Sequence, residues 1–254
     1  MNAAANQSLL CGSDPFPVEI LNRDSTVPVL LLCEHAGRSI PRSLNNLQLN
    51  EDVLISHRAW DIGAEELARK ISSLLNAPLI LQRYSRLVID ANRPPDGQES
   101  VLEISDGEPI PGNQRITSSD RKRRVDEIFA PMDHAIARTM DSKLKACFSI
   151  HSFTPRMNGV DRPWHAGFLT RHAKPTAEAL IQSVARQRPE LELALNEPYQ
   201  IDNETDWFIP HHAEARELPH CLIEVRNDQI DHPAGVALWA GLLARAIADF
   251  METL

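Results

Sequence analysis

The sequence predicts a three-layer α/β/α fold, with a mixed central sheet between two layers of helices. Apolar runs of strand length alternate with amphipathic helical patterns from one end of the chain to the other, and this alternation is typical of α/β domains. Four apolar runs end in polar residues capable of chemistry, over residues 29–35, 87–93, 146–152 and 221–226. Ligands of open α/β sheets bind at the carboxyl ends of the strands, so we expect these four ends to form one site.

In the first half of the chain we predict, in order, a strand over residues 27–35, a short helix over 51–57, a helix between Asp61 and Asn76, strands over 79–81 and 87–90, and a long loop over 93–116. The helix after Asp61 carries leucine and isoleucine side chains at helical spacing on one face. Asn76, with a proline two residues later, ends it. The loop over 93–116 lacks periodicity, and a loop of this length is usually functional or disordered.

In the second half we predict, in order, a charged helix from Thr117, strands to His151 and over 165–169, a helix over 175–188, an irregular region over 190–216, a strand to Glu224 and a helix over 233–250. Thr117 and Asp120 fit a capping box, and Pro131 should kink or split the helix that follows. No linker or repeat divides the chain. We therefore predict a single domain over residues 16–254, preceded by a flexible tail over residues 1–15.

The composition excludes several classes of function. The 254 residues carry a formal net charge of −9, which argues against a nucleic-acid partner. No run of roughly 18 or more apolar residues exists, so we expect no membrane span. Four widely spaced cysteines without a Cys-x-x-Cys pair fit a reducing cytoplasm and predict no structural zinc site. We expect a cytoplasmic protein with a small-molecule partner, and the composition leaves the oligomeric state open.

Two histidines, His35 and His151, lie at the ends of predicted strands, where a neutral imidazole can bind zinc. Catalytic zinc takes three protein ligands and keeps one position open. As the third ligand we prefer Asp61, which precedes a helix, to Glu34, whose side chain should alternate to the other face of its strand. The alternatives are that Asp61 caps the helix and that the histidines are hydrogen-bonded structural residues.

Glu224 stands inside an apolar strand, where a carboxylate is costly unless it is paired or used. It is our candidate for the general base of a hydrolase, and an ion pair with Arg226, two residues on, is the alternative. Arg86 and Arg93 flank the strand predicted over 87–90. A guanidinium binds a carboxylate through two parallel hydrogen bonds, so these arginines could clamp an anionic substrate; solvated side chains or structural ion pairs are the alternative.

A nucleophilic mechanism is a further alternative. Cys33 precedes Glu34 and His35, but its apolar surroundings should make the thiol inert. Ser152 follows His151, yet no Gly-x-Ser-x-Gly motif surrounds it.

The candidate residues lie in stretches that resemble known enzymes. Residues 149–152, 90–93 and 223–226 resemble the third zinc-ligand stretch, the Asp-Leu-Asn-Arg motif and the catalytic-glutamate strand of the zinc carboxypeptidases and aspartoacylase. Roughly residues 27–250 resemble the N-formylglutamate amidohydrolase family, through stretches 34–41, 57–64, 86–93 and 218–228. Carboxypeptidases carry a His-x-x-Glu pair, whereas Arg38 stands three residues after His35; the carboxylate ligand must therefore come from elsewhere, and Asp61 is our candidate.

The resemblance implies a zinc-exopeptidase-like (phosphorylase/hydrolase-like) fold and a metal-dependent hydrolase that cleaves the amide bond of N-formyl or N-acyl amino acids such as N-formyl-L-glutamate. The resemblance implies that His35, Asp61 and His151 hold zinc or another divalent metal, and that Glu224 is the general base and then the acid. It implies that Asn92 and Arg93 bind the substrate carboxylate. Arg86 is implied as a catalytic residue that steadies the oxyanion or a second carboxylate. A non-catalytic or differently specific carboxylate-binding member of the same fold is the alternative, and the metal content would distinguish the two.

Overall fold

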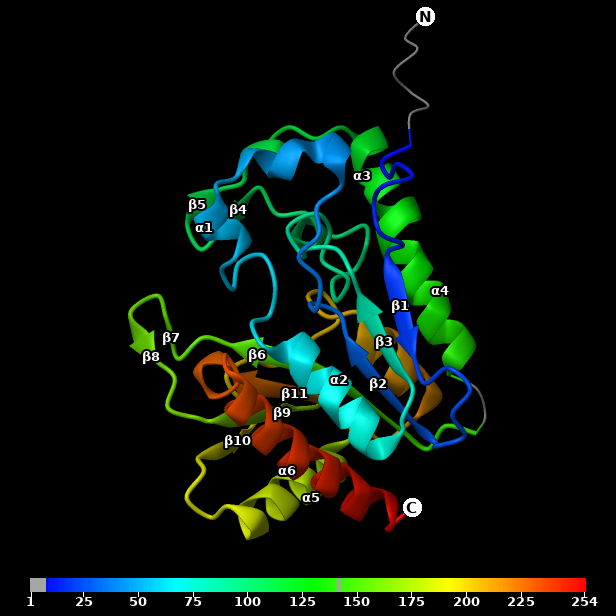
Figure 1. Ribbon diagram of the computed structural model, residues 1–254, viewed down its shortest axis with the longest axis vertical. Helices are drawn as coiled ribbons and strands as arrows, with labels where there is room; N and C mark the ends of the chain where they lie inside the picture. The colour runs from blue at the N-terminus through cyan, green and yellow to red at the C-terminus, as the bar shows by residue number, and fades with distance from the viewer. Residues whose placement is uncertain (1–7, 141–142) are drawn as a thin grey trace, which may run out of the picture.

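The computed structural model describes residues 8–140 and 143–254. Within them a seven-stranded sheet has the order β1-β3-β2-β6-β11-β9-β10 (Figure 1). Its strands are β1 Val18–Leu21, β2 Val29–Cys33, β3 Leu79–Gln82, β6 Ala146–Phe153, β9 Ala166–Leu169, β10 Leu193–Leu195 and β11 His220–Arg226. The β1–β3 and β9–β11 pairs are antiparallel and the other pairs are parallel. The predicted mixed sheet of an α/β fold is therefore confirmed.

Helices cover both faces of the sheet (Figure 1). The α-helices of the described chain are α1 Glu51–Leu54, α2 Ala64–Leu75, α3 Ser118–Arg124, α4 Ala130–Thr139, α5 Lys174–Gln187 and α6 Pro233–Met251. On one face, α2, α5 and α6 bury apolar side chains against Leu31 and Ile150. On the other face, α4 and a π-helical turn at Phe208–Ala213 pack against Leu32. The two apolar layers enclose the sheet, as a three-layer fold requires.

Strand alternation decides which side chains reach the carboxyl end of the sheet on the α4 face. In the parallel β6–β11 pair, His151 lies directly opposite Glu224. His151 is four residues after Cys147, and Glu224 is two residues after Leu222; both apolar residues pack on the α4 face. Because side chains alternate along a strand, His151 and Glu224 point to this same face.

The strand predicted over residues 87–90 is wrong. These residues form turns, because Ser85 offers its own acceptors to the following backbone. The Val88 N–H donates to the Ser85 carbonyl at 2.9 Å, and the Leu87 N–H donates to the Ser85 hydroxyl at 3.1 Å. The sheet is completed at this edge by β1, which the sequence pattern did not predict. Arg86 and Arg93 consequently lie in a loop and not at the two ends of a strand.

The helix predicted from Thr117 begins as expected, with the capping box of Thr117 and Asp120. Pro131 lies in the first turn of α4, after an irregular turn of the helix. One π-helical turn, Val125–Phe129, joins α3 to α4, and the Ala130 N–H donates to the Val125 carbonyl. A proline cannot donate to the carbonyl four residues before it, and a widened turn is one way to accommodate that loss.

The two regions predicted to be irregular contain short elements. Residues 93–116 hold a hairpin of β4 Ile104–Ser105 and β5 Glu108–Pro109, and residues 190–216 hold β10 and the π-helical turn. A further hairpin, β7 Arg156–Met157 and β8 Val160–Asp161, follows β6. The β4–β5 and β7–β8 hairpins both contribute residues to the pocket described below.

The N-terminal end of the chain differs from what its sequence suggested, whereas the C-terminal helix is present as predicted. Residues 1–7 of the predicted tail lie outside the described residues, but residues 8–15 are attached: Leu9 is buried, its N–H donates to Glu127 at 2.8 Å, and the Tyr84 hydroxyl donates to the Pro15 carbonyl at 2.7 Å. At the other end, α6 is long and apolar enough to cross a membrane by length and composition alone. Its side chains Trp239 and Leu243 are fully buried, as in a core helix.

Candidate active site

A pocket of about 410 Å³ opens at the carboxyl ends of β6 and β11. All seven site residues predicted from the sequence line it: His35, Asp61, Arg86, Asn92, Arg93, His151 and Glu224. Residues from the two long loops, including Ile104 and Thr205, form other parts of its wall. The predicted convergence of distant stretches at one edge of the sheet is therefore present, although residues 86–93 arrive there as a loop.

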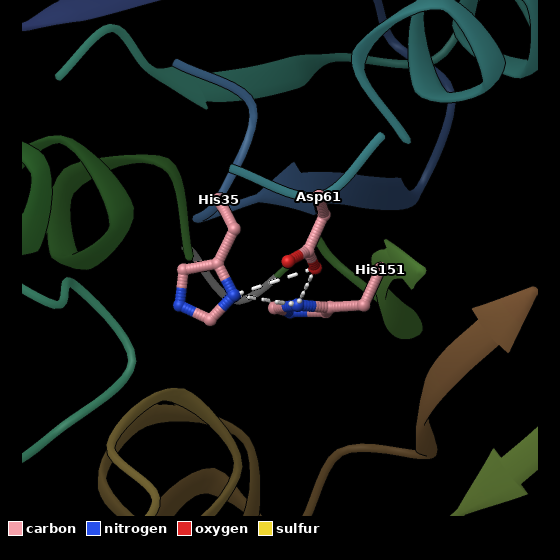
Figure 2. Close-up of side chains that lie close together, drawn as sticks. All are labelled: His35, Asp61 and His151. Atoms are coloured by element: carbon pink, nitrogen blue, oxygen red, sulfur yellow. Dashed lines mark hydrogen bonds and ion pairs between the residues drawn. The ribbon is translucent and has the colours of Figure 1, made fainter. Parts of the chain in front are cut away.

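The side chains of His35, Asp61 and His151 point toward one another (Figure 2). The two Nδ1 atoms are 3.1 Å apart, and the Asp61 Oδ2 atom lies 2.9 Å from Nδ1 of His151 and 3.4 Å from Nδ1 of His35. Tetrahedral zinc with bonds of about 2.0–2.1 Å separates its ligand atoms by roughly 3.3 Å. The three atoms thus form a triangle of the size that a zinc ion needs.

The backbone places Asp61 at this triangle. Its N–H donates to the His35 carbonyl at 3.0 Å, and its Oδ2 atom accepts from the Ser152 N–H at 3.2 Å. Helix α2 begins three residues later, with Gly63 in the N-cap position and no side-chain cap. The alternative that Asp61 caps this helix is therefore wrong.

Each histidine is held from behind by a carboxylate. The outer nitrogen of His35, Nε2, lies 2.7 Å from Asp90. The outer nitrogen of His151 lies 2.8 Å from the Ser149 hydroxyl and 3.2 Å from Glu34. Metal-binding histidines usually have the second ring nitrogen held in this way, which fixes the ring and its tautomer. Both Nδ1 atoms are thereby left to face the centre.

This arrangement gives Glu34 and Asp90 a supporting role that the sequence did not predict. Glu34 lies behind His151, where it also accepts a hydrogen bond from the Ser149 hydroxyl. That position favours Asp61 over Glu34 as the third ligand. Asp90 was part of the stretch 90–93 that resembled the carboxypeptidase motif, and Glu34 precedes His35. Only the three-dimensional path of the chain shows which ring each one supports.

Arg86 joins the carboxylates of the site. Its Nη1 atom lies 3.3 Å from Asp61, and its Nη2 atom lies 2.7 Å from Asp90. Burial opposes ionisation of both carboxyls, but the facing histidines hold the pKa of Asp61 below its usual range, and Arg86 holds the pKa of Asp90 well below its usual range. Both groups are therefore anionic at neutral pH.

Glu224 is buried beside this cluster but is not bound into it. It is 6% exposed, and its Oε2 atom has no hydrogen-bond partner among the described residues. The alternative of an ion pair with Arg226 is wrong, because Arg226 donates to Asp228 at 2.8 Å and to the Pro163 carbonyl at 2.8 Å. Burial raises the pKa of Glu224 to about 7. A carboxyl group with such a pKa can take up and release a proton near neutral pH.

Asn92 and Arg93 border the pocket and also hold its wall. The Asn92 side-chain oxygen accepts from the N–H groups of Trp207 and Phe208 at 3.3 and 3.1 Å. The Asn92 side-chain NH₂ group donates to Asp206 at 3.3 Å, so both ends of this amide are occupied. Arg93 donates to the Thr205 carbonyl and lies 3.6 Å from Glu99 and 3.8 Å from Asp206. Both ion pairs of Arg93 are long, which leaves its guanidinium able to take a closer anionic partner.

The nucleophilic alternatives find no support in the structure. Cys33 is fully buried, and burial raises the pKa of its thiol well above the usual range. A thiol in that state is a poor nucleophile. The Ser152 hydroxyl donates to the Ile62 carbonyl at 2.8 Å.

Comparison with known proteins identifies related chains. The N-formylglutamate amidohydrolase family matches residues 27–230. The gene product Atu2144 from Agrobacterium tumefaciens, known from its crystal structure, is 31% identical, with a TM-score of 0.91 over 96% of this chain and 98% of its own. An N-formylglutamate amidohydrolase from Ralstonia eutropha JMP134 is 15% identical and shares the fold, with a TM-score of 0.68 over 94% of this chain and 98% of its own. No curated protein sequence matches the chain.

Proposed function

Because the chain belongs to the N-formylglutamate amidohydrolase family, we propose that it is a metal-dependent hydrolase of N-formyl or N-acyl amino acids, with N-formyl-L-glutamate as the representative substrate. The family supports the amidohydrolase chemistry. The observation that carries the proposed metal dependence is the triangle of two Nδ1 atoms and one carboxylate oxygen, with the outer nitrogen of each ring held by a carboxylate.

His35, Asp61 and His151 are the proposed ligands. Two imidazoles and one carboxylate form a donor set that suits zinc, and other divalent metals accept it as well. When bound, the ion supplies Lewis acidity to the acyl carbonyl and to a water molecule. Asp61 is ionised, as a metal ligand must be, because its pKa is lowered.

Glu224 is the proposed general base and acid. Its Oε2 atom accepts a proton as water attacks the acyl carbon, and it returns that proton to the nitrogen that leaves when the amide bond breaks. The absence of a hydrogen-bond partner in the described chain leaves this oxygen available. A pKa raised to about 7 by burial suits a group that must work in both directions near neutral pH.

Arg93 is the proposed partner of the substrate carboxylate beside the acylated nitrogen. We propose that Asn92 supports this clamp by holding the backbone of Trp207 and Phe208 at the pocket wall. Arg86 is proposed to keep Asp61 in place and to steady the oxyanion, or a second carboxylate, from the pocket side.

The proposed partner is a small molecule, with no nucleic acid or membrane involved. The single domain over residues 16–254 and a cytoplasmic location remain proposals. The first is supported by the central sheet, which takes strands from β1 to β11. The second is supported by the four free cysteines.

The test is an assay with protein purified without chelator, supplied with N-formyl-L-glutamate and N-acetyl-L-glutamate. We expect release of the free amino acid, loss of that activity on removal of the metal, and its recovery when zinc is returned. Metal-loaded protein that hydrolyses neither substrate, yet binds them, would favour the alternative of a non-catalytic carboxylate-binding protein.

A further inference from the structure

Two charged side chains that line the pocket form no ion pair with any residue of the ranges 8–140 and 143–254. One is Glu224, the proposed base, and the other is Arg58. The remaining charged groups are matched. Arg86 pairs with Asp61, Arg93 lies near Asp206, and His57 lies 2.6 Å from Asp106. Each of the other two arginines of the pocket lies within 3.8 Å of a carboxylate, so the unpaired guanidinium of Arg58 needs a separate explanation.

The surroundings of Arg58 satisfy little of its guanidinium. Its one hydrogen bond within the described chain runs from Nη2 to the Glu108 carbonyl, at 3.2 Å. Its Nε atom is buried and has no hydrogen-bond partner there. A guanidinium has five N–H donors and is costly to bury without an anion. The side chain is half-buried against the pocket, so an anion that enters the pocket can supply what the protein does not.

We propose that Arg58 binds an anionic group on the side chain of the substrate, remote from the amide that is cleaved. This inference rests on the proposed function, in which Arg93 holds the carboxylate beside the acylated nitrogen. Arg58 would then be the residue that selects acidic over neutral side chains. Such selection can be strong, because a polar group in a binding site is left unpaired when the substrate lacks its counterpart.

The experiment compares two substrates that differ little except in charge, N-formyl-L-glutamate and N-formyl-L-glutamine. We expect the wild type to prefer the acid in kcat/KM by roughly ten- to a hundredfold, as for one hydrogen bond to a charged group. Arg58→Gln should bring that ratio close to one, mainly by lowering kcat/KM for the acid. Arg58→Lys keeps the charge and should retain part of the preference.

Two control variants separate this role from support of the pocket wall. His57 contacts Asp106, which lies in the turn between β4 and β5. His57→Gln removes this contact but leaves Arg58 in place. Arg38→Gln removes a nearby arginine that stacks on Trp60 and does not line the pocket. Both variants should leave the acid-to-amide ratio as it is in the wild type. An unchanged ratio in Arg58→Gln, or equal losses on both substrates, would overturn the inference.

A binding measurement tests the role of Arg58 separately from the proposed hydrolysis. Glu224→Gln protein is titrated with each of the two compounds by calorimetry, alone and combined with Arg58→Gln. Tighter binding of the acid that disappears with Arg58→Gln supports the role of Arg58, even if the wild type hydrolyses neither compound and the proposed reaction fails. If the acid binds no more tightly than the amide, the assignment of Arg58 is wrong.

Discussion

The part of the chain that the structure describes contains two clusters of two histidines and an aspartate, and they are built differently. The first, His35, Asp61 and His151, is buried at the carboxyl end of the sheet and lines the pocket. The second, Asp133, His211 and His212, joins α4 to the π-helical turn, away from the pocket lining. The residue types are the same, so their arrangement decides what each cluster can do.

In the second cluster, a contact with Asp133 holds Nε2 of His212, while Nδ1 of His212 is buried without a hydrogen-bond partner among the described residues. One oxygen of Asp133 lies 2.7 Å from Nε2 of His212 and accepts from the Trp207 indole at 2.8 Å. His211 is exposed and stacks on Trp207, with ring centroids 3.8 Å apart. In the first cluster, by contrast, the carboxylates behind the rings leave both Nδ1 atoms free to face Asp61. A carboxylate at the outer nitrogen of each ring, more than the residue types present, therefore distinguishes a metal site from a structural network.

The largest expected effect concerns Glu224, which lies outside both networks. Glu224→Gln keeps the shape of the side chain but cannot accept the proton of water. We expect kcat to fall by roughly 10²–10⁴-fold, the usual cost of losing a general base, while the metal content measured by elemental analysis stays the same. Near-normal turnover would remove Glu224 from the mechanism.

A smaller effect should separate the two clusters directly. Asp90 and Asp133 each lie 2.7 Å from Nε2 of a histidine, so their replacement by asparagine is a matched pair. Asp90→Asn should weaken zinc affinity by roughly 10- to 100-fold, as measured by competition with a chelator. Asp133→Asn should leave that affinity unchanged and lower the free energy of unfolding by about 1 kcal/mol. Equal zinc affinities in the two variants would show that the carboxylate at the outer ring nitrogen is not what enables the first cluster to bind a metal.

The smallest effect of the series concerns the wall that connects the two clusters. Asn92 binds the backbone of Trp207, and the next residue, Arg93, faces the pocket. Arg93→Lys keeps the charge but loses the two-donor fork, so kcat/KM for an N-acyl amino acid should fall by roughly tenfold. The same variant assayed on the substrate whose α-carboxylate is an amide should lose little. Comparable losses on both substrates would assign Arg93 to the wall alone.

The strand and helix patterns predicted much of this architecture, because alternation and helical spacing are local properties of the sequence. They placed His35, His151 and Glu224 at one edge of the sheet. They failed at residues 87–90, where the Ser85 hydroxyl competes with the sheet for backbone N–H groups. They also missed β1, a short edge strand that depends on pairing with β3.

The rest of the site depends on contacts between residues far apart in the chain. The Ser149 and Glu34 side chains, 115 residues apart, together hold His151. Asn92 is 116 residues from Phe208, and its side-chain oxygen accepts a hydrogen bond from the Phe208 N–H. The unpaired state of Arg58 is a property of the whole pocket, since it emerges only when the partners of the other arginines are known. No pattern in a short stretch of sequence contains these facts.

The central claim is that the first cluster, and not the second, holds a metal ion. The most direct test is elemental analysis of the wild type, His35→Ala, His151→Ala and His212→Ala, all purified without chelator. We predict about one equivalent of zinc or another divalent metal in the wild type and in His212→Ala, and almost none in the other two variants. Unchanged metal content in both His35→Ala and His151→Ala, or its loss in His212→Ala, would contradict the account.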